Sequence, residues 1–183
     1  CDHIEYGNYF DTMGTVGYSL HFNAYYKELL GWFTSKNIAI VNKSNSFGLN
    51  SLEKKNAGVQ VVKIQMPQTS SYPYYIEYRD GSGFDSNLNK SSLLSNQNGV
   101  FINRHIGDGF GSFPRLIDAS PTSVNWNEDI QKATLNNNLS FKDPGRGITI
   151  TKIRAPGPTK SQFVSIKFDK PQCVHNNPQI QNV

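Results

Sequence analysis

The chain has 183 residues, of which 37% are hydrophobic and 17% are charged, and its formal net charge is +4. This length allows one well-formed hydrophobic core, and no apolar run is long enough to span a bilayer. Lysine and arginine are scattered along the chain instead of clustered, so the mild positive charge does not indicate a nucleic-acid partner.

The first 36 residues do not show the pattern of a β-sheet. Glycines occur at short intervals among them, so the backbone is expected to turn often. The stretch HFNAYYKELLGW then predicts a short helix, with Asn23 as its N-cap and Gly31 as the left-handed residue after its end. Because so short a helix is marginal by itself, its apolar face is expected to dock on another surface. The residues of that face are Phe22, Tyr26, Leu29 and Leu30.

From residue 37 onward, short runs rich in valine, isoleucine, tyrosine and phenylalanine alternate with turn clusters such as DGSG and PGRG. This pattern predicts a mainly β fold, an antiparallel β-sandwich preceded by a short loop and helix. The expected organisation is 1–36 for the loop and helix, 37–170 for the β-sandwich, and 171–183 for a linker or the start of a further module. The predicted strands are 38–42, 46–51, 59–65, 74–79, 99–105, 115–118, 139–141, 148–154 and 163–168.

A complete zinc site is not expected within this sequence. The four histidines are His3, His21, His105 and His175. No two of them have the H-E-x-x-H spacing that places both imidazoles on one side of a helix, and there is no Cys-x-x-Cys. The two cysteines, Cys1 and Cys173, can form a disulfide with each other in an exported protein or pair with cysteines elsewhere.

The stretch DGSGFDSNLNK contains a pattern of residues that fits a calcium site. Asp85, Asn87 and Asn89 occupy alternate positions, and hard oxygen ligands at this spacing can hold calcium. The preference of these residues for turns explains the same pattern without an ion. In the same way, the tyrosines of SYPYYIEY can stack on a sugar or a peptide, or pack half-buried in a strand.

Two N-terminal stretches, EYGNYFDTMG and HFNAYYKELLGW, follow one another closely. Together they resemble gametolysin-like zinc metallopeptidases of the metzincin clan, in which a segment E-Y-G-D-x-x-D-x-M-G precedes a helix F-N-A-x-x-K-x-x-L-G-W. Asn8 stands where that family often has aspartate. Further along, YYIEYRDGSGFDSNL, GVFINRHI, RLIDASP and SFKDPGRGITITKI are similar to the β domain that follows the peptidase.

By this resemblance, Met13 is the Met-turn methionine, whose thioether forms an apolar floor beneath the zinc-binding histidines. Asp11 and Gly14 would shape the turn, and Gly14 and Thr15 would lie near the wall of the substrate pocket. The resemblance places the zinc-binding motif and its general-base glutamate before residue 1. We therefore expect no catalytic residue and no metal ligand in this chain.

The resemblance thus implies a secreted, extracellular zinc metalloendopeptidase, a hydrolase that cleaves the peptide bonds of a protein or peptide substrate. These residues are interpreted as an inactive fragment of it that packs against the missing catalytic half. Neither a nucleic-acid partner nor a membrane span is expected. The alternatives are a non-catalytic extracellular β-sandwich that binds carbohydrate or protein, and a structural spacer between modules.

Overall fold

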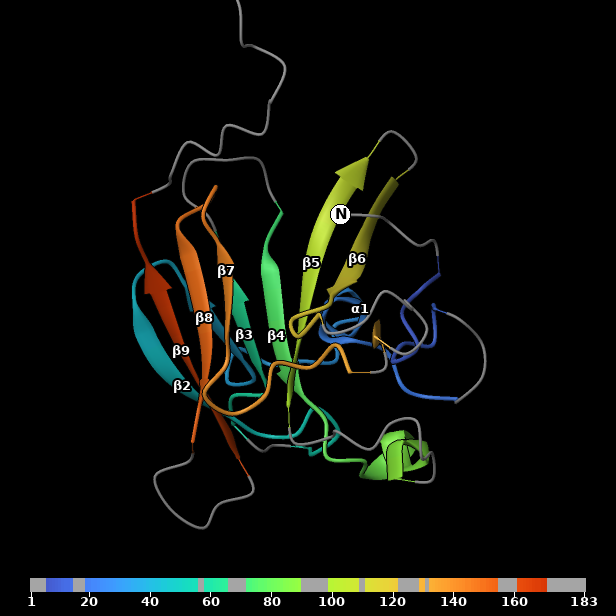
Figure 1. Cartoon of the computed structure of the whole chain (residues 1–183). Coiled ribbons are helices and arrows are strands. Elements are labelled where there is room, and N and C mark those ends of the chain that lie inside the picture. The colour runs from blue at the N-terminus through green and yellow to red at the C-terminus, as the bar shows by residue number, and fades with distance from the viewer. Residues whose placement is uncertain are drawn as a thin grey trace, which may run out of the picture.

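A computed structural model shows a mainly β fold that consists of two sheets with little helix (Figure 1), as the sequence predicts. No helix of the described residues has the length and apolar character that crossing a bilayer requires. The described residues are 6–14, 19–55, 58–65, 72–89, 99–108, 111–121, 129–130, 132–154 and 161–170.

The first sheet has five strands in the order β1-β3-β4-β5-β6. β1 runs parallel to β3, whereas the other neighbours are antiparallel. This parallel pair departs from the predicted antiparallel pairing, because β2, which lies between β1 and β3 in the sequence, belongs to the other sheet. The strands are β1 (Ile38–Val41), β3 (Val61–Ile64), β4 (Tyr74–Tyr78), β5 (Val100–Asp108) and β6 (Gly111–Ile117).

The second sheet has four antiparallel strands in the order β2-β9-β8-β7. Each of the strands predicted from the sequence overlaps a strand of one of the two sheets, so these predictions are confirmed. The strands of the second sheet are β2 (Asn45–Leu49), β7 (Ser140–Asp143), β8 (Ile148–Ile153) and β9 (Gln162–Phe168).

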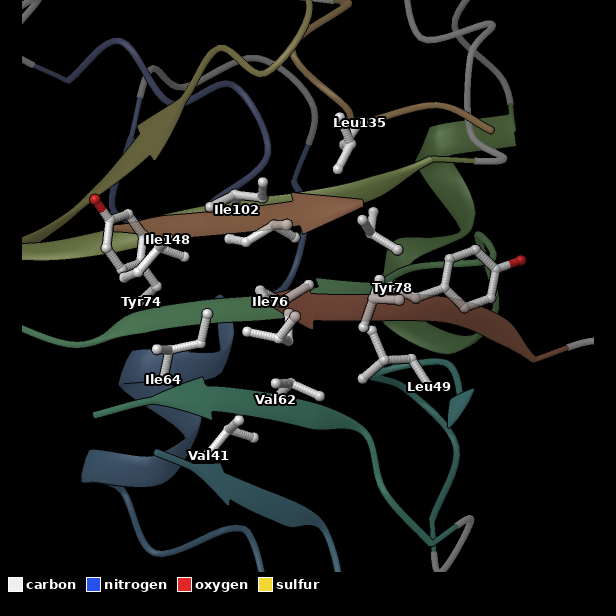
Figure 2. Close-up of a cluster of buried hydrophobic side chains, with 14 residues drawn as sticks. Val41, Leu49, Val62, Ile64, Tyr74, Ile76, Tyr78, Ile102, Leu135 and Ile148 are labelled. Carbon is white, nitrogen blue, oxygen red and sulfur yellow. The ribbon is translucent and has the colours of Figure 1, made fainter. Parts of the chain in front are cut away.

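Both sheets contribute to one buried cluster of apolar side chains (Figure 2). Val62, Ile76 and Ile102 come from the first sheet, and Ile148 and Ile150 come from the second. In β8 these isoleucines alternate with more exposed threonines, which is the pattern of a strand with one buried face. A register slip of one residue would turn the isoleucines outward, so the shared cluster fixes the strand register.

Strand β4 is buried on both faces. All five of its residues are buried. Alternate side chains join the cluster between the sheets, whereas Tyr75 and Glu77 face the opposite side. The helix α1 (Ala24–Leu29) covers this outer face and packs Ala24 into a second apolar cluster with Tyr75 and Val61. The N-terminal segment therefore forms a third layer over part of the first sheet.

The helix α1 docks through a different face from the one the sequence predicts. Its buried residues are Ala24 and Lys27, whereas Leu29 and Leu30 are 69% and 50% exposed. The small side chain of Ala24 lets the helix approach the sheet closely, and the amine of Lys27 is neutralised by an ion pair with the carboxylate of Glu53. Expecting the leucines to be the docking residues was therefore wrong.

Candidate functional site

The residues from Asp11 to Gly14 form a tight turn that presents Met13. The Gly14 N–H donates to the carbonyl oxygen of Asp11 at 2.9 Å, and the Met13 N–H donates to Oδ1 of Asp11 at 3.0 Å. A Cβ atom at position 14 would lie 1.8 Å from the carbonyl oxygen of Asn8, so only glycine fits there. The turn leaves the Met13 side chain 52% exposed, outside the hydrophobic core.

Asp11 also connects this turn to helix α1. Its Oδ2 atom accepts a hydrogen bond from Nδ2 of Asn23, and Oδ1 of Asn23 accepts one from the Tyr26 N–H at 3.2 Å. Asn23 is therefore the N-cap of the helix, as predicted. The other end is also as predicted, because Gly31 has a φ of 70° just beyond the helix.

Three carboxyl groups surround the buried guanidinium of Arg79, the residue that follows β4. Nε of Arg79 donates to Oε1 of Glu77 at 2.9 Å, and Nη1 donates to Oδ1 of Asp85 at 3.3 Å. The third group is Asp11. Burial alone would lower the pKa of Arg79, but the charges of these carboxylates outweigh burial and hold that pKa above its usual value. Arg79 is thus a permanent cation inside the protein.

Burial acts in the opposite sense on the acidic members of this network. It raises the pKa of Glu77, and the positive charge of Arg79 opposes this rise. It also raises the pKa of Asp11, where the hydrogen bond from the Met13 N–H and the charge of Arg79 both oppose the rise. Without Arg79, therefore, ionising these two carboxyl groups would carry a larger free-energy cost.

The network attaches the N-terminal segment to the first sheet. Oε2 of Glu77 accepts a hydrogen bond from the Ala24 N–H at 2.6 Å, and Oδ1 of Asp85 accepts one from the His21 N–H at 3.0 Å. Arg79 Nη1 also donates to the carbonyl oxygen of His21 at 3.2 Å. Nη2 of Arg79 and Oδ2 of Asp85 are buried without a hydrogen-bond partner. Movement of the segment would leave still more buried polar atoms unpaired.

An exposed aromatic group, here called the Trp32–Phe84 surface, lies next to the same segment. The ring of His21 meets Trp32 and Phe84 edge-to-face, with centroids 5.2 and 5.0 Å apart. Trp32 is 52% exposed and Phe84 is 75% exposed. Burial, assisted by the nearby charge of Lys27, lowers the pKa of His21. The imidazole is therefore neutral at pH 7 and belongs to an uncharged surface.

The structure brings Asp11, Met13 and Gly14 of the predicted site together in one turn. Thr15, the other residue expected at the pocket wall, lies outside the described residues, as do His3, His175 and both cysteines. Within the described part, no three histidine, cysteine or acidic side chains gather into a group that could hold a metal ion. In the candidate calcium loop, Asp85 is buried against Arg79, and the side chain of Asn89 is not described.

The charge network around Arg79 is the feature that sequence reasoning missed. Glu77 and Arg79 alternate in the run YYIEYR and so lie on one face of the strand, a pattern that ordinarily indicates a solvated face. Tyr75 precedes them on that same face and is buried. An aromatic residue two positions from a Glu-x-Arg pair was the one available signal that this face is covered.

Comparison with known proteins assigns no family to this arrangement of turn, helix and two sheets. No protein-family model matches the chain, no curated protein matches it, and no solved structure matches it.

Proposed function

We propose that this chain is the C-terminal part of a gametolysin-like zinc metalloendopeptidase. Residues 1–36 would complete the catalytic domain, and residues 37–170, which hold the two sheets, would form the domain that follows it. The observation that carries the proposal is the placement of Met13, a methionine fixed in a turn and yet 52% exposed. A thioether held in this way suits an apolar floor for groups that pack on it.

The residues that match the family pattern fall into two groups. Asn23 caps the helix, Lys27 pairs with Glu53, and Gly31 ends the helix, so these residues build the segment itself. Met13 and Trp32 are half-exposed instead. The competing explanation of Met13 is an ordinary core methionine, and such a residue would be buried. Its exposure supports a role towards residues outside this chain.

The zinc ligands do not belong to these 183 residues, because the sequence has no H-E-x-x-H. In the parent enzyme, zinc would supply a Lewis acid for the scissile carbonyl and lower the pKa of a bound water. The part of this chain would be structural. Asp11, fixed by Asn23, would hold the turn. The turn would in this way keep the apolar side chain of Met13 in a fixed position beneath the zinc site.

The first test of this proposal is the parent gene. We expect an H-E-x-x-H within about 30 codons before Cys1, because the motif precedes the Met-turn in metzincins. A complete upstream reading frame without such a motif would refute the proposal. As a second measurement, the purified 183-residue protein should retain no zinc after dialysis and should not cleave a fluorogenic casein substrate. Zinc-dependent cleavage by this chain alone would contradict the assignment of the chemistry to upstream residues.

Substitution of Met13 in the parent enzyme tests the role of the turn directly. We expect Met13→Gln to lower zinc retention, because an amide would replace the apolar floor. Leu29→Gln is the matched control, since Leu29 is likewise exposed in the N-terminal segment but lies outside the turn. Equal zinc content and equal peptidase activity in both variants would count against a Met-turn at this position.

A second candidate function is a non-catalytic module that binds carbohydrate. The observation in its favour is the Trp32–Phe84 surface, since exposed rings offer flat apolar faces to a ligand. Titration with soluble glycans, followed by tryptophan fluorescence, would show saturable binding that Phe84→Ala weakens. If Phe84→Ala binds glycans as well as the unchanged chain does, this surface is not the site.

A further inference from the structure

The outer edge of β1 is an open strand edge. β1 comes first in the order of its sheet, and within the described residues it pairs only with β3. The carbonyl oxygens of Asn37 and Val41 accept backbone hydrogen bonds from the β3 side at 3.0 and 3.1 Å. Because this direction alternates along a strand, the N–H and C=O groups of Ile38 and Ile40 point away from the sheet.

The other three edges of the sheets carry features that discourage strand addition, such as charge, proline or glycine. These features are Pro114 and Arg115 in β6, Lys142 and Asp143 in β7, and Asn45 and Gly48 in β2. β1 reads Ile-Ala-Ile-Val and has none of them. Moreover, Ile40 is 65% exposed, although it is a large apolar residue in the middle of the strand.

A pocket of about 310 Å³ adjoins this edge. Its lining consists of Glu28, Phe33, Thr34, Ser35, Ile38 and Ile40. The carboxylate of Glu28 is already satisfied, because it accepts two hydrogen bonds from Nζ of Lys63 at 2.8 Å and one from the hydroxyl of Tyr75 at 2.6 Å. The pocket therefore suits an uncharged side chain, and the two isoleucines and the phenylalanine favour an apolar one.

Exposed lysines stand at both ends of this edge. Lys36 precedes β1 and Lys43 follows it, and no ion pair among the described residues uses either amine. A second copy of the chain is a poor partner for the edge. Antiparallel pairing of two β1 strands would bring Lys36 of each copy next to Lys43 of the other, and like charges repel. A segment with acidic ends avoids this repulsion and gains attraction instead.

We propose that the outer edge of β1 binds an extended peptide segment of another protein by strand addition. The backbone of the peptide would pair with the outward N–H and C=O groups of Ile38 and Ile40. One apolar side chain of the peptide would enter the adjoining pocket, and acidic residues on both sides would meet Lys36 and Lys43. This site is separate from the Met13 turn and does not depend on zinc.

The test is fluorescence anisotropy with the purified chain and the labelled peptide Asp-Glu-Val-Phe-Val-Ile-Glu-Asp. We expect saturable binding that does not change when a zinc chelator is added. The same peptide N-methylated at both valines and at the phenylalanine and isoleucine lacks the central backbone donors on both of its edges and should bind at least about tenfold more weakly. A version with lysine at both ends should also bind more weakly, and added salt should reduce this difference.

Two variants at position 40 test whether the peptide binds at the outer edge of β1. Ile40→Pro removes the outward N–H but leaves the β3 hydrogen bonds in place, since proline is tolerated on an edge where its nitrogen faces outward. It should weaken binding at least about tenfold. Ile40→Val keeps the donor and should bind almost as the unchanged chain does. If Ile40→Pro does not fold, the N-methylated peptide provides the same test from the ligand side.

The contribution of the lysine charges is tested by reversing them. The double variant Lys36→Glu/Lys43→Glu should prefer the lysine-ended peptide over the acidic one. The proposal is wrong if the acidic peptide does not bind, if N-methylation has no effect, or if Ile40→Pro binds normally. It is also wrong if sedimentation shows a dimer of this chain that Ile40→Pro dissociates, because the edge would then serve self-association.

Discussion

Glu77 on β4 accepts a hydrogen bond from the N–H of Ala24, the first residue of helix α1, at 2.6 Å. Its other carboxylate oxygen accepts from Nε of Arg79 at 2.9 Å. One buried side chain thus joins the N-terminal segment, the sheet and the central cation. The attachment of helix α1 to the sheet therefore rests on charge pairing as well as on apolar contact.

Arg79→Met should be strongly destabilising. The change removes the only described cation in contact with Glu77 and Asp85 and leaves both carboxyl groups buried without their ion pair. We expect the free energy of unfolding in urea to fall by about 3–5 kcal/mol. Lys167→Met is the control, because Lys167 pairs with Asp169 at the surface, where both side chains are largely exposed. That variant should change stability by less than about 0.5 kcal/mol. Similar losses for both variants would contradict a stabilising role for the buried network.

Asn23→Ala should loosen the turn and the helix together. Asn23 both caps α1 and donates to Asp11, so alanine removes a cap and one hydrogen bond to a buried carboxyl group. The expected cost is about 2 kcal/mol in urea unfolding. Asn23→Asp retains the capping oxygen but opposes Asp11 with a second carboxyl group. Its stability relative to the unchanged chain should therefore rise as the pH falls from 7 to 5. An Asn23→Ala variant as stable as the unchanged chain would exclude this coupling.

Asp118 should make the protein more stable in mild acid. Burial, together with the hydrogen bond to Asp129 and its charge, raises the pKa of Asp118 to about 6. Between this pH and the ordinary aspartate pKa near 3.8, the folded state holds a proton that the unfolded state has released. The free energy of unfolding should thus increase as the pH falls from 7.5 towards 4.5.

Asp118→Asn is the matched variant, because an amide can hydrogen-bond to Asp129 without titrating. The difference in unfolding free energy between the two proteins should depend on pH in this window. A constant difference from pH 4.5 to 7.5 would mean that the two carboxyl groups do not share a proton.

Lys152→Met should stabilise the fold. The side chain of Lys152 lies on the core side of β8 and is 1% exposed, and its amine donates to Oδ1 of Asn137 at 2.6 Å. Burial lowers the pKa of this amine, so the charged form is disfavoured in the folded state. Methionine removes that cost, and we expect a gain of about 1 kcal/mol at pH 7.

The pH dependence gives an independent check on Lys152. Between its lowered pKa and the ordinary lysine pKa near 10.5, the unfolded state binds the extra proton, so stability should rise with pH there. Lys152→Met should lose this rise, whereas Lys142→Met, at an exposed position of β7, should keep it. A loss of stability in Lys152→Met at pH 7 would show that the hydrogen bond to Asn137 outweighs the burial of the charge.

The strands and the ends of the helix could be predicted because local patterns determine them. Alternation in GITITKI identified β8, and Asn23 and Gly31 identified the limits of α1. The docking face of the helix was not predictable in this way. Leu29 and Leu30 are the most hydrophobic candidates, but the helix residue that packs against Tyr75 and Val61 is Ala24. Which side of the helix meets the sheet depends on contacts between distant segments, which no local pattern encodes.

The turn was identified through the resemblance of EYGNYFDTMG to the Met-turn segment of a known family, and the structure brings Asp11, Met13 and Gly14 together. The anchorage of the N-terminal segment was not predictable, because Asp85 lies 64 residues after His21, the residue whose N–H it binds. Contacts over such separations arise only when the chain has folded. The parallel placement of β1 is similar, since it depends on β2 joining the other sheet.

The burial of β4 on both faces affects how the protein can be divided. A cut in the turn between α1 and β1 separates the sequence at residue 36, but it does not separate two independent cores. The sheet without its N-terminal segment would expose Tyr75, Val61 and the ion pair of Glu77 with Arg79 to water. The helix and the sheets would therefore fold as a single cooperative unit. Evolution and protein engineering would both have to keep the two parts together.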